Sequence, residues 1–165
     1  VEGPAVTAVL GDRLLVATTG GARSPPGLRD AVQKRLGVSL TELYGCREAG
    51  GIARNGVVYP GVEVLMLRSQ SDTDSAAALS AFRDGPGEIC VASPRLARHG
   101  YLSNERGDAF FVAANGTTFY RTGDVGMLRV DPATGDRHLQ VTGRAAATRK
   151  LPNGEWIATA AVEAA

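Results

Sequence analysis

The sequence predicts an α/β fold in which the end of a βαβ parallel-sheet layer is followed by a small antiparallel β-sheet or barrel. Near the N-terminus, a helix-periodic segment separates two apolar runs, which is the pattern of a βαβ unit. Short alternating runs separated by Gly, Pro, Asp and Asn fill most of the remaining chain. With 165 residues, 44% of them hydrophobic, and 21 glycines, the composition indicates a turn-rich body around an aliphatic core.

The βαβ unit is expected to begin with a buried strand over residues 13–17, which ends at a pair of glycines that permit a sharp bend. A helix follows, with Ser24 as its N-cap and Pro25 at its first position, and Gly37 ends it. The apolar residues of this helix recur at four-residue spacing: Leu28, Val32 and Leu36. A second strand over residues 39–44 completes the unit.

The alternating runs predict five further strands, over residues 57–59, 62–67, 88–92, 126–130 and 138–142. Residues 69–81 are polar and then Ala-rich, which favours a surface loop with a short helix. Residues 150–157 read as a hairpin that precedes a helical turn starting at Ala160.

Charge and composition exclude several classes of partner. A formal net charge of +1 gives no reason to expect nucleic-acid binding, and no apolar run is long enough to span a bilayer. The chain does not open with a signal stretch, so the cytoplasm is the expected compartment. Cys46 and Cys90 form no CxxC pair and are expected to be free thiols, and His99 and His138 lack an acid partner or a ligand cluster.

The most specific segment is Tyr120-Arg121-Thr122-Gly123-Asp124, which is followed after a strand pair by Gly143-Arg144. Asp124 is expected on a tight glycine turn between two strands, where a carboxylate is able to accept both hydroxyls of a ribose. These residues alone leave a plain polar β-turn open, and an Asp124–Arg144 pair fits either a ribose edge or a structural salt bridge.

Taken in order, the motifs resemble the AMP-forming acyl- and aryl-CoA synthetase superfamily, which includes the adenylation domains of peptide synthetases. The segments that precede Tyr120 are Gly20-Gly21-Ala22, Tyr44-Gly45-Cys46-Arg47-Glu48, Gly87-Glu88-Ile89 and Gly100-Tyr101. The run Lys150-Leu151-Pro152-Asn153-Gly154-Glu155-Trp156 looks most like long-chain acyl-CoA synthetases and carboxylic acid reductase adenylation domains.

The resemblance implies roles for particular residues. Tyr44, Gly45, Asp124 and Arg144 would bind nucleotide, with the tyrosine stacked on adenine and the aspartate on ribose. Glu48 would ligate the Mg²⁺ of ATP, a hard cation that prefers oxygen. Arg47 replaces the threonine of this motif, so phosphate contact, blockage of the site and pairing with Glu48 all stay open.

Two further segments match by position. Gly20, Gly21 and Ala22 match the wall of the acyl pocket, although a plain strand-to-helix turn would also require glycine. Ala146 stands at the hinge, where the family has a polar pivot residue. Its small apolar side chain puts rotation between the two catalytic conformations in question.

The resemblance also implies three parts: residues 1–55 from the large sheet, 56–142 as a β-rich subdomain, and 143–165 as the hinge and start of a C-terminal α+β subdomain. Nothing in the chain matches the family's phosphate loop or adenylation lysine. We therefore expect a fragment of an ATP- and Mg²⁺-dependent carboxylate-activating enzyme, inactive alone, that acts with the rest of its domain or multienzyme on CoA or an acyl-carrier protein. The alternative is a catalytically silent scaffold or docking module.

Overall fold

The computed structural model describes residues 14–22, 24–68, 85–101, 109–113, 115–150 and 156–158. Within these residues, nine strands form one mixed sheet whose main path runs β1-β2-β3-β4-β9-β8-β6-β5, with β7 paired to β8. The strands are β1 (Ala17–Gly20), β2 (Leu40–Cys46), β3 (Gly50–Arg54), β4 (Val57–Val58), β5 (Glu63–Leu67), β6 (Gly85–Ala92), β7 (Phe110–Val112), β8 (Thr118–Val130) and β9 (Arg137–Arg144). Strands β3 and β4 pair with each other on either side of residue 55, and the three-part division that the resemblance implies stays a prediction.

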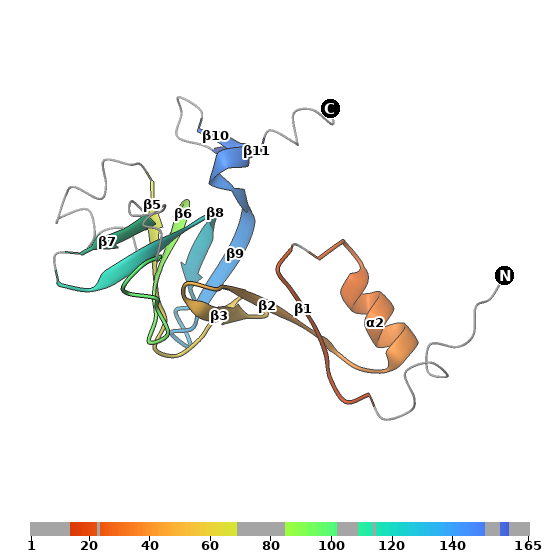
Figure 1. Ribbon diagram of the computed structural model, residues 1–165. Coiled ribbons are helices and arrows are strands. Elements are labelled where there is room, and N and C mark those ends of the chain that lie inside the picture. The colour runs from red at the N-terminus through yellow and green to blue at the C-terminus, as the bar shows by residue number, and fades with distance from the viewer. Residues whose placement is uncertain are drawn as a thin grey trace.

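The predicted βαβ unit is present, because β1 and β2 are parallel and the helix α2 (Leu28–Leu36) connects them. Figure 1 shows α2 and β1 at one side of the molecule, away from β5, β6 and β7. The predicted helix end is confirmed: Gly37 takes a φ of 71°, and its amide donates to the carbonyl of Gln33.

The start of this unit differs from the prediction. Gly27, and not Ser24, is the N-cap of α2. Pro25 is followed by Pro26, and a residue before proline is pushed out of the helical region, so the helix begins beyond both prolines. The first strand starts at Ala17 and not at residue 13, while Leu15 and Val16 are 86% and 63% exposed. The expected burial of this apolar run is therefore wrong for Leu15 and Val16, whereas Leu14 and Ala17 are half-buried.

All the other pairings in the nine-stranded sheet are antiparallel, as the alternating runs predict. The predicted strands over 57–59, 62–67, 88–92, 126–130 and 138–142 correspond to β4, β5, β6, the end of β8, and β9. The sequence did not predict β3 or β7. Both are short, and β3 begins with two glycines, so neither has a clear alternating pattern.

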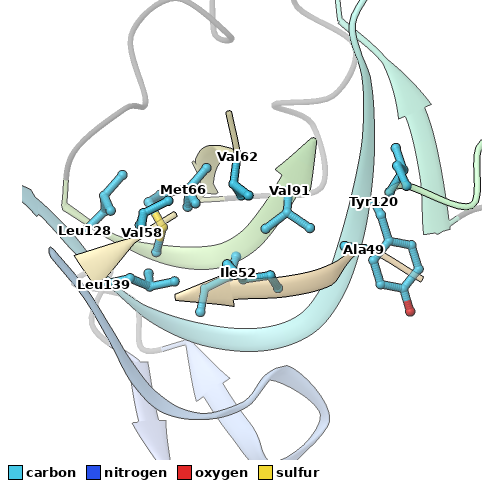
Figure 2. Close-up of a cluster of buried hydrophobic side chains, with 12 residues drawn as sticks. Ala49, Ile52, Val58, Val62, Met66, Val91, Tyr120, Leu128 and Leu139 are labelled. Carbon is cyan, nitrogen blue, oxygen red and sulfur yellow. The ribbon is translucent and has the colours of Figure 1, made fainter. Parts of the chain in front are cut away.

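The core lies between β3 and the curved strands β5, β6, β8 and β9. Ile52, Met66, Ile89 and Val91 are fully buried in it, and Leu128 is 1% exposed. Figure 2 shows side chains of this cluster pointing toward one another, with the Tyr120 hydroxyl at its edge. Burial of such aliphatic side chains is the main favourable contribution to folding, at about 1.5–3 kcal/mol for each large side chain.

Beyond β9, the chain forms a 3₁₀ turn over Ala145–Ala147 and a hairpin of β10 (Thr148–Lys150) and β11 (Trp156–Ala158) (Figure 1). This confirms the expected hairpin over residues 150–157, whereas the helical turn from Ala160 and the loop over 69–81 lie outside the described residues. Cys46 and Cys90 are free thiols, as predicted. The described part of the chain contains no helix of the length and hydropathy needed to cross a membrane.

Candidate functional site

A groove of about 810 Å³ runs along β1, β2, β8 and β9. Its walls include all seven residues for which the sequence suggests nucleotide or acyl contacts. These are Gly20, Gly21, Ala22, Tyr44, Gly45, Asp124 and Arg144. Residues separated by more than 100 positions in the sequence therefore share one concave surface.

Asp124 lies within the long strand β8, and not on a turn as the sequence suggested. Gly123 has a φ of 71°, which favours glycine, and the pairing of β8 with β9 shifts register between Val125 and Gly126. The predicted turn is therefore an irregularity inside a continuous strand. Its effect is to place the Asp124 carboxylate in the groove while its neighbours stay in the sheet.

Two side chains hold the Asp124 carboxylate. The hydroxyl of Tyr44 donates to Oδ2 at 2.8 Å, and Nε of Arg144 lies 3.0 Å from Oδ1. Asp124 and Arg144 are directly paired across β8 and β9, so the sheet register brings this ion pair together. The Asp124 side chain is 14% exposed, whereas that of Arg144 is 67% exposed.

Thr122 connects this carboxylate to the sheet, a role that the sequence did not indicate. Its buried hydroxyl donates to the carbonyl of Ile89 at 2.8 Å and accepts the backbone amide of Asp124 at 3.1 Å. The Thr122 carbonyl accepts from Nη1 of Arg144 at 3.2 Å. These bonds fix the backbone on both sides of Gly123.

Burial raises the pKa of Tyr44 well above its usual value, and the neighbouring Asp124 charge adds to this shift despite an opposing hydrogen bond to Thr122. Tyr44 therefore remains protonated at physiological pH and keeps a proton to donate to the carboxylate.

Arg121 and Glu88 form a second ion pair, between β6 and β8. Nε of Arg121 lies 3.2 Å from each carboxylate oxygen of Glu88, and Nη2 also contacts Oε2. The two side chains are 19% and 11% exposed. The pair connects β6 to β8 where their register shifts between Glu88 and Cys90, next to the residues that carry Asp124.

Glu48 does not line the groove. It lies in the turn after β2, where the hydroxyl of Tyr101 donates to its Oε1. Partial burial by itself raises the pKa of Glu48, but hydrogen bonds from Tyr101, its own backbone amide, Cys46 and Tyr120 outweigh burial and lower it. Glu48 is therefore a carboxylate at neutral pH, and it is held against Tyr101 and not among the residues that line the groove.

In the described part of the chain, no three His, Cys, Asp or Glu side chains gather into a metal site. An ionised Glu48 fits Mg²⁺ as a single hard oxygen ligand, and phosphate oxygens and water would have to supply the remaining positions of an octahedral shell.

The glycines of the groove have structural reasons of their own. A Cβ on Gly20 would lie 2.8 Å from the carbonyl oxygen of Leu43, and one on Gly45 would overlap that of Gly50. Gly21 has a φ of 79° and open space around it. Close strand approach thus accounts for Gly20 and Gly45, and backbone conformation for Gly21. Ala146, the proposed hinge residue, is exposed in the 3₁₀ turn after β9.

One face of β9 contributes groove residues that the sequence analysis missed: His138, Gln140 and Thr142. They alternate with the buried Leu139 and the half-buried Val141, and the same spacing continues to Arg144. In the sequence, these residues occupy every second position before Arg144, and this alternation would have predicted that they share its face of the strand.

Solved structures provide the comparison with known proteins. The chain is 29% identical to the adenylation domain of a carboxylate reductase from Mycobacterium chelonae, over 93% of this chain and 23% of that one, with a TM-score of 0.64. The chain is 27% identical to the A domain of a carboxylic acid reductase from Segniliparus rugosus, which is in complex with AMP and a co-purified carboxylic acid. That match covers 94% of this chain and 23% of the A domain, with a TM-score of 0.64. The chain is also 27% identical to an A-PCP didomain of carboxylic acid reductase from S. rugosus in complex with AMP. That match covers 94% of this chain and 20% of the didomain, with a TM-score of 0.64.

A long-chain-fatty-acid-CoA ligase and an amide bond synthetase also match. No protein-family model and no curated protein sequence matches the chain. The chain spans 20% to 23% of the length of the three reductase structures. These matches confirm the resemblance that the motifs indicated: the chain has the structure of part of an adenylation domain of the adenylate-forming superfamily.

Proposed function

We propose that the groove is the ribose side of a nucleotide site in an ATP-dependent enzyme that activates carboxylates. The observation that carries this proposal is the Asp124 carboxylate, which faces the groove and is held by Tyr44 and Arg144. A fixed carboxylate accepts two neighbouring hydroxyls in a defined geometry, and the similar S. rugosus domains are complexes with AMP.

In the proposed reaction, a carboxylate oxygen of the acyl substrate attacks the α-phosphorus of ATP. The bond between the α- and β-phosphates breaks, and pyrophosphate leaves. A thiolate of CoA or of a carrier-protein phosphopantetheine then attacks the acyl carbon, and AMP leaves. In both steps, Asp124 and Tyr44 would hold the nucleoside in place, and Gly20, Gly21 and Ala22 would line the acyl side of the groove.

The A-PCP didomain supports a carrier protein as the acyl acceptor, and the remainder of an adenylation domain would complete the site. The free thiols of Cys46 and Cys90 fit a reducing compartment such as the cytoplasm. Ala146 would serve as the hinge between β9 and the β10–β11 hairpin.

The first test is calorimetric titration of the chain with AMP and with a non-hydrolysable acyl-AMP analogue. Asp124→Ala is expected to weaken AMP binding by roughly tenfold to a hundredfold, because it removes a charged acceptor of two hydrogen bonds. Asp136→Ala is the matched control, since Asp136 is exposed and outside the groove. Equal affinity of the Asp124→Ala variant and the unsubstituted chain would refute the ribose assignment.

A second prediction concerns Glu48, which we propose as the one protein ligand of the Mg²⁺ that offsets phosphate charge. Glu48→Gln is expected to reduce the gain in ATP affinity caused by Mg²⁺ by roughly fivefold, because a neutral amide oxygen replaces a charged ligand. Titrations with and without Mg²⁺ measure this gain, and exposed Glu63→Gln on β5 is the control. An unchanged gain would remove Glu48 from the site.

A catalytically silent scaffold or docking module is the second candidate. Glu48 lies outside the groove and is hydrogen-bonded to Tyr101, Arg47 replaces the motif threonine, and Ala146 replaces a polar pivot. A chain that binds neither AMP nor the acyl-AMP analogue at millimolar concentration would favour this function over the first.

A further inference from the structure

We infer that the Tyr44 hydroxyl is a positioning group that fixes the Asp124 carboxylate for recognition of both ribose hydroxyls. This inference rests on the proposed function, because it concerns the same groove. It differs from the stacking role that the sequence resemblance implies for Tyr44, since it assigns the work to the hydroxyl and not to the ring.

The geometry leaves acceptor positions on both carboxylate oxygens. Tyr44 donates to Oδ2 at 2.8 Å, and Arg144 lies 3.0 Å from Oδ1. Each ionised carboxylate oxygen has about two lone-pair positions, so one protein donor on each leaves room for one ribose hydroxyl on each. The Tyr44 hydroxyl has a single proton, and the 2.8 Å contact to Asp124 takes precedence over the 3.4 Å contact to Thr122.

The two holders of Asp124 are not equivalent. The guanidinium of Arg144 is on a side chain that is 67% exposed, where water competes for its contacts. Tyr44 is partly buried, and its ring packs against the core cluster that contains Ile52 and Tyr120. A ring held on one side by the core has little rotamer freedom, so its hydroxyl restrains the carboxylate more firmly than Arg144 does.

The bond also connects distant parts of the chain. Tyr44 is on β2 and Asp124 on β8, which are separated in the sheet by β3, β4 and β9. The groove lies along β2 and β8, so this hydrogen bond joins its two walls. Tyr44 therefore sets the orientation of Asp124 from the opposite wall of the groove.

The test compares AMP with 2′,3′-dideoxy-AMP, which lacks both ribose hydroxyls, in the unsubstituted chain and in Tyr44→Phe. Phenylalanine keeps the ring and removes the hydroxyl. We expect the preference for AMP over the dideoxy analogue to fall roughly fivefold to tenfold, because a charged acceptor loses its buried donor. Affinity for the dideoxy analogue should stay the same. Tyr59→Phe is the control, since Tyr59 is outside the groove.

The possible outcomes distinguish failure of the proposed nucleotide site from failure of the positioning role of Tyr44. If the unsubstituted chain does not bind AMP, both the proposed function and this inference are overturned. If it prefers AMP and Tyr44→Phe keeps that preference, only the positioning role is overturned. An equal loss of affinity for both nucleotides would also overturn it, because that pattern indicates stacking or general disruption.

A second measurement keeps the inference testable if Tyr44→Phe does not fold. Hydrogen exchange of the Tyr44 hydroxyl, observed by NMR on ¹³C-labelled tyrosine, should be slow in the unsubstituted chain and at least tenfold faster in Asp124→Asn. Equal exchange rates would show that the hydroxyl does not hold the carboxylate.

Discussion

Replacing Arg121 with methionine is expected to lower the free energy of unfolding by about 3–5 kcal/mol, because it leaves the Glu88 carboxylate charged, buried and without its partner. The Glu88 side chain is 11% exposed, and both of its oxygens contact Arg121. Urea unfolding followed by circular dichroism measures the loss. Since this pair connects β6 to β8 beside Asp124, weaker AMP binding is expected at the same time.

The chain offers a matched control for this prediction. Arg29 and Glu42 also form an ion pair, at 3.3 Å, but their side chains are 52% and 43% exposed. Arg29→Met should therefore cost no more than about 1 kcal/mol. Adding Glu88→Leu to Arg121→Met should recover most of the lost stability, because no buried charge remains. A loss for Arg121→Met as small as that for Arg29→Met would contradict the structural role of the pair.

Local signals in the sequence predicted much of the fold. Gly37 ends α2 because glycine adopts positive φ at low cost, and alternation reveals a strand with one buried face, as in β9. The wrong prediction for the start of β1 concerns burial, which depends on other segments and not on local signals. An apolar run such as Leu15-Val16 indicates that something covers it, but does not identify the covering segment, and these two side chains are exposed in the structure.

Part of the candidate site was likewise predictable from the sequence, and part depends on contacts between distant segments. The motif order identified Tyr44, Asp124 and Arg144, and the structure brings all three together in the groove. The orientation of Asp124 depends on a register shift and on Thr122, which are properties of strand pairing and not of the segment itself. For Glu48, the decisive contact is with Tyr101, more than 50 positions away, and motif spacing contains no information about it.

Gly126→Ala is expected to destabilise the fold by about 3 kcal/mol or more and to abolish the nucleotide affinity attributed to Asp124. A methyl group there would overlap the carbonyl oxygen of Gln140 and lie 3.1 Å from Cδ1 of Ile89. A backbone carbonyl in a sheet has no alternative rotamer, so β8 and β9 would have to separate or shift their register. Thermal unfolding and AMP titration of the variant measure the two effects.

Gly51→Ala is the matched control, because Gly51 is also in a strand and does not have a positive φ. Its added methyl would meet only the ring of Tyr59, at 3.2 Å, and a side chain is able to move. We expect a loss below about 1 kcal/mol there. The contrast tests a link between fold and site: Asp124 and Arg144 face each other only in the register that Gly126 permits. A folded Gly126→Ala variant with undiminished AMP binding would show that the ion pair does not depend on that register.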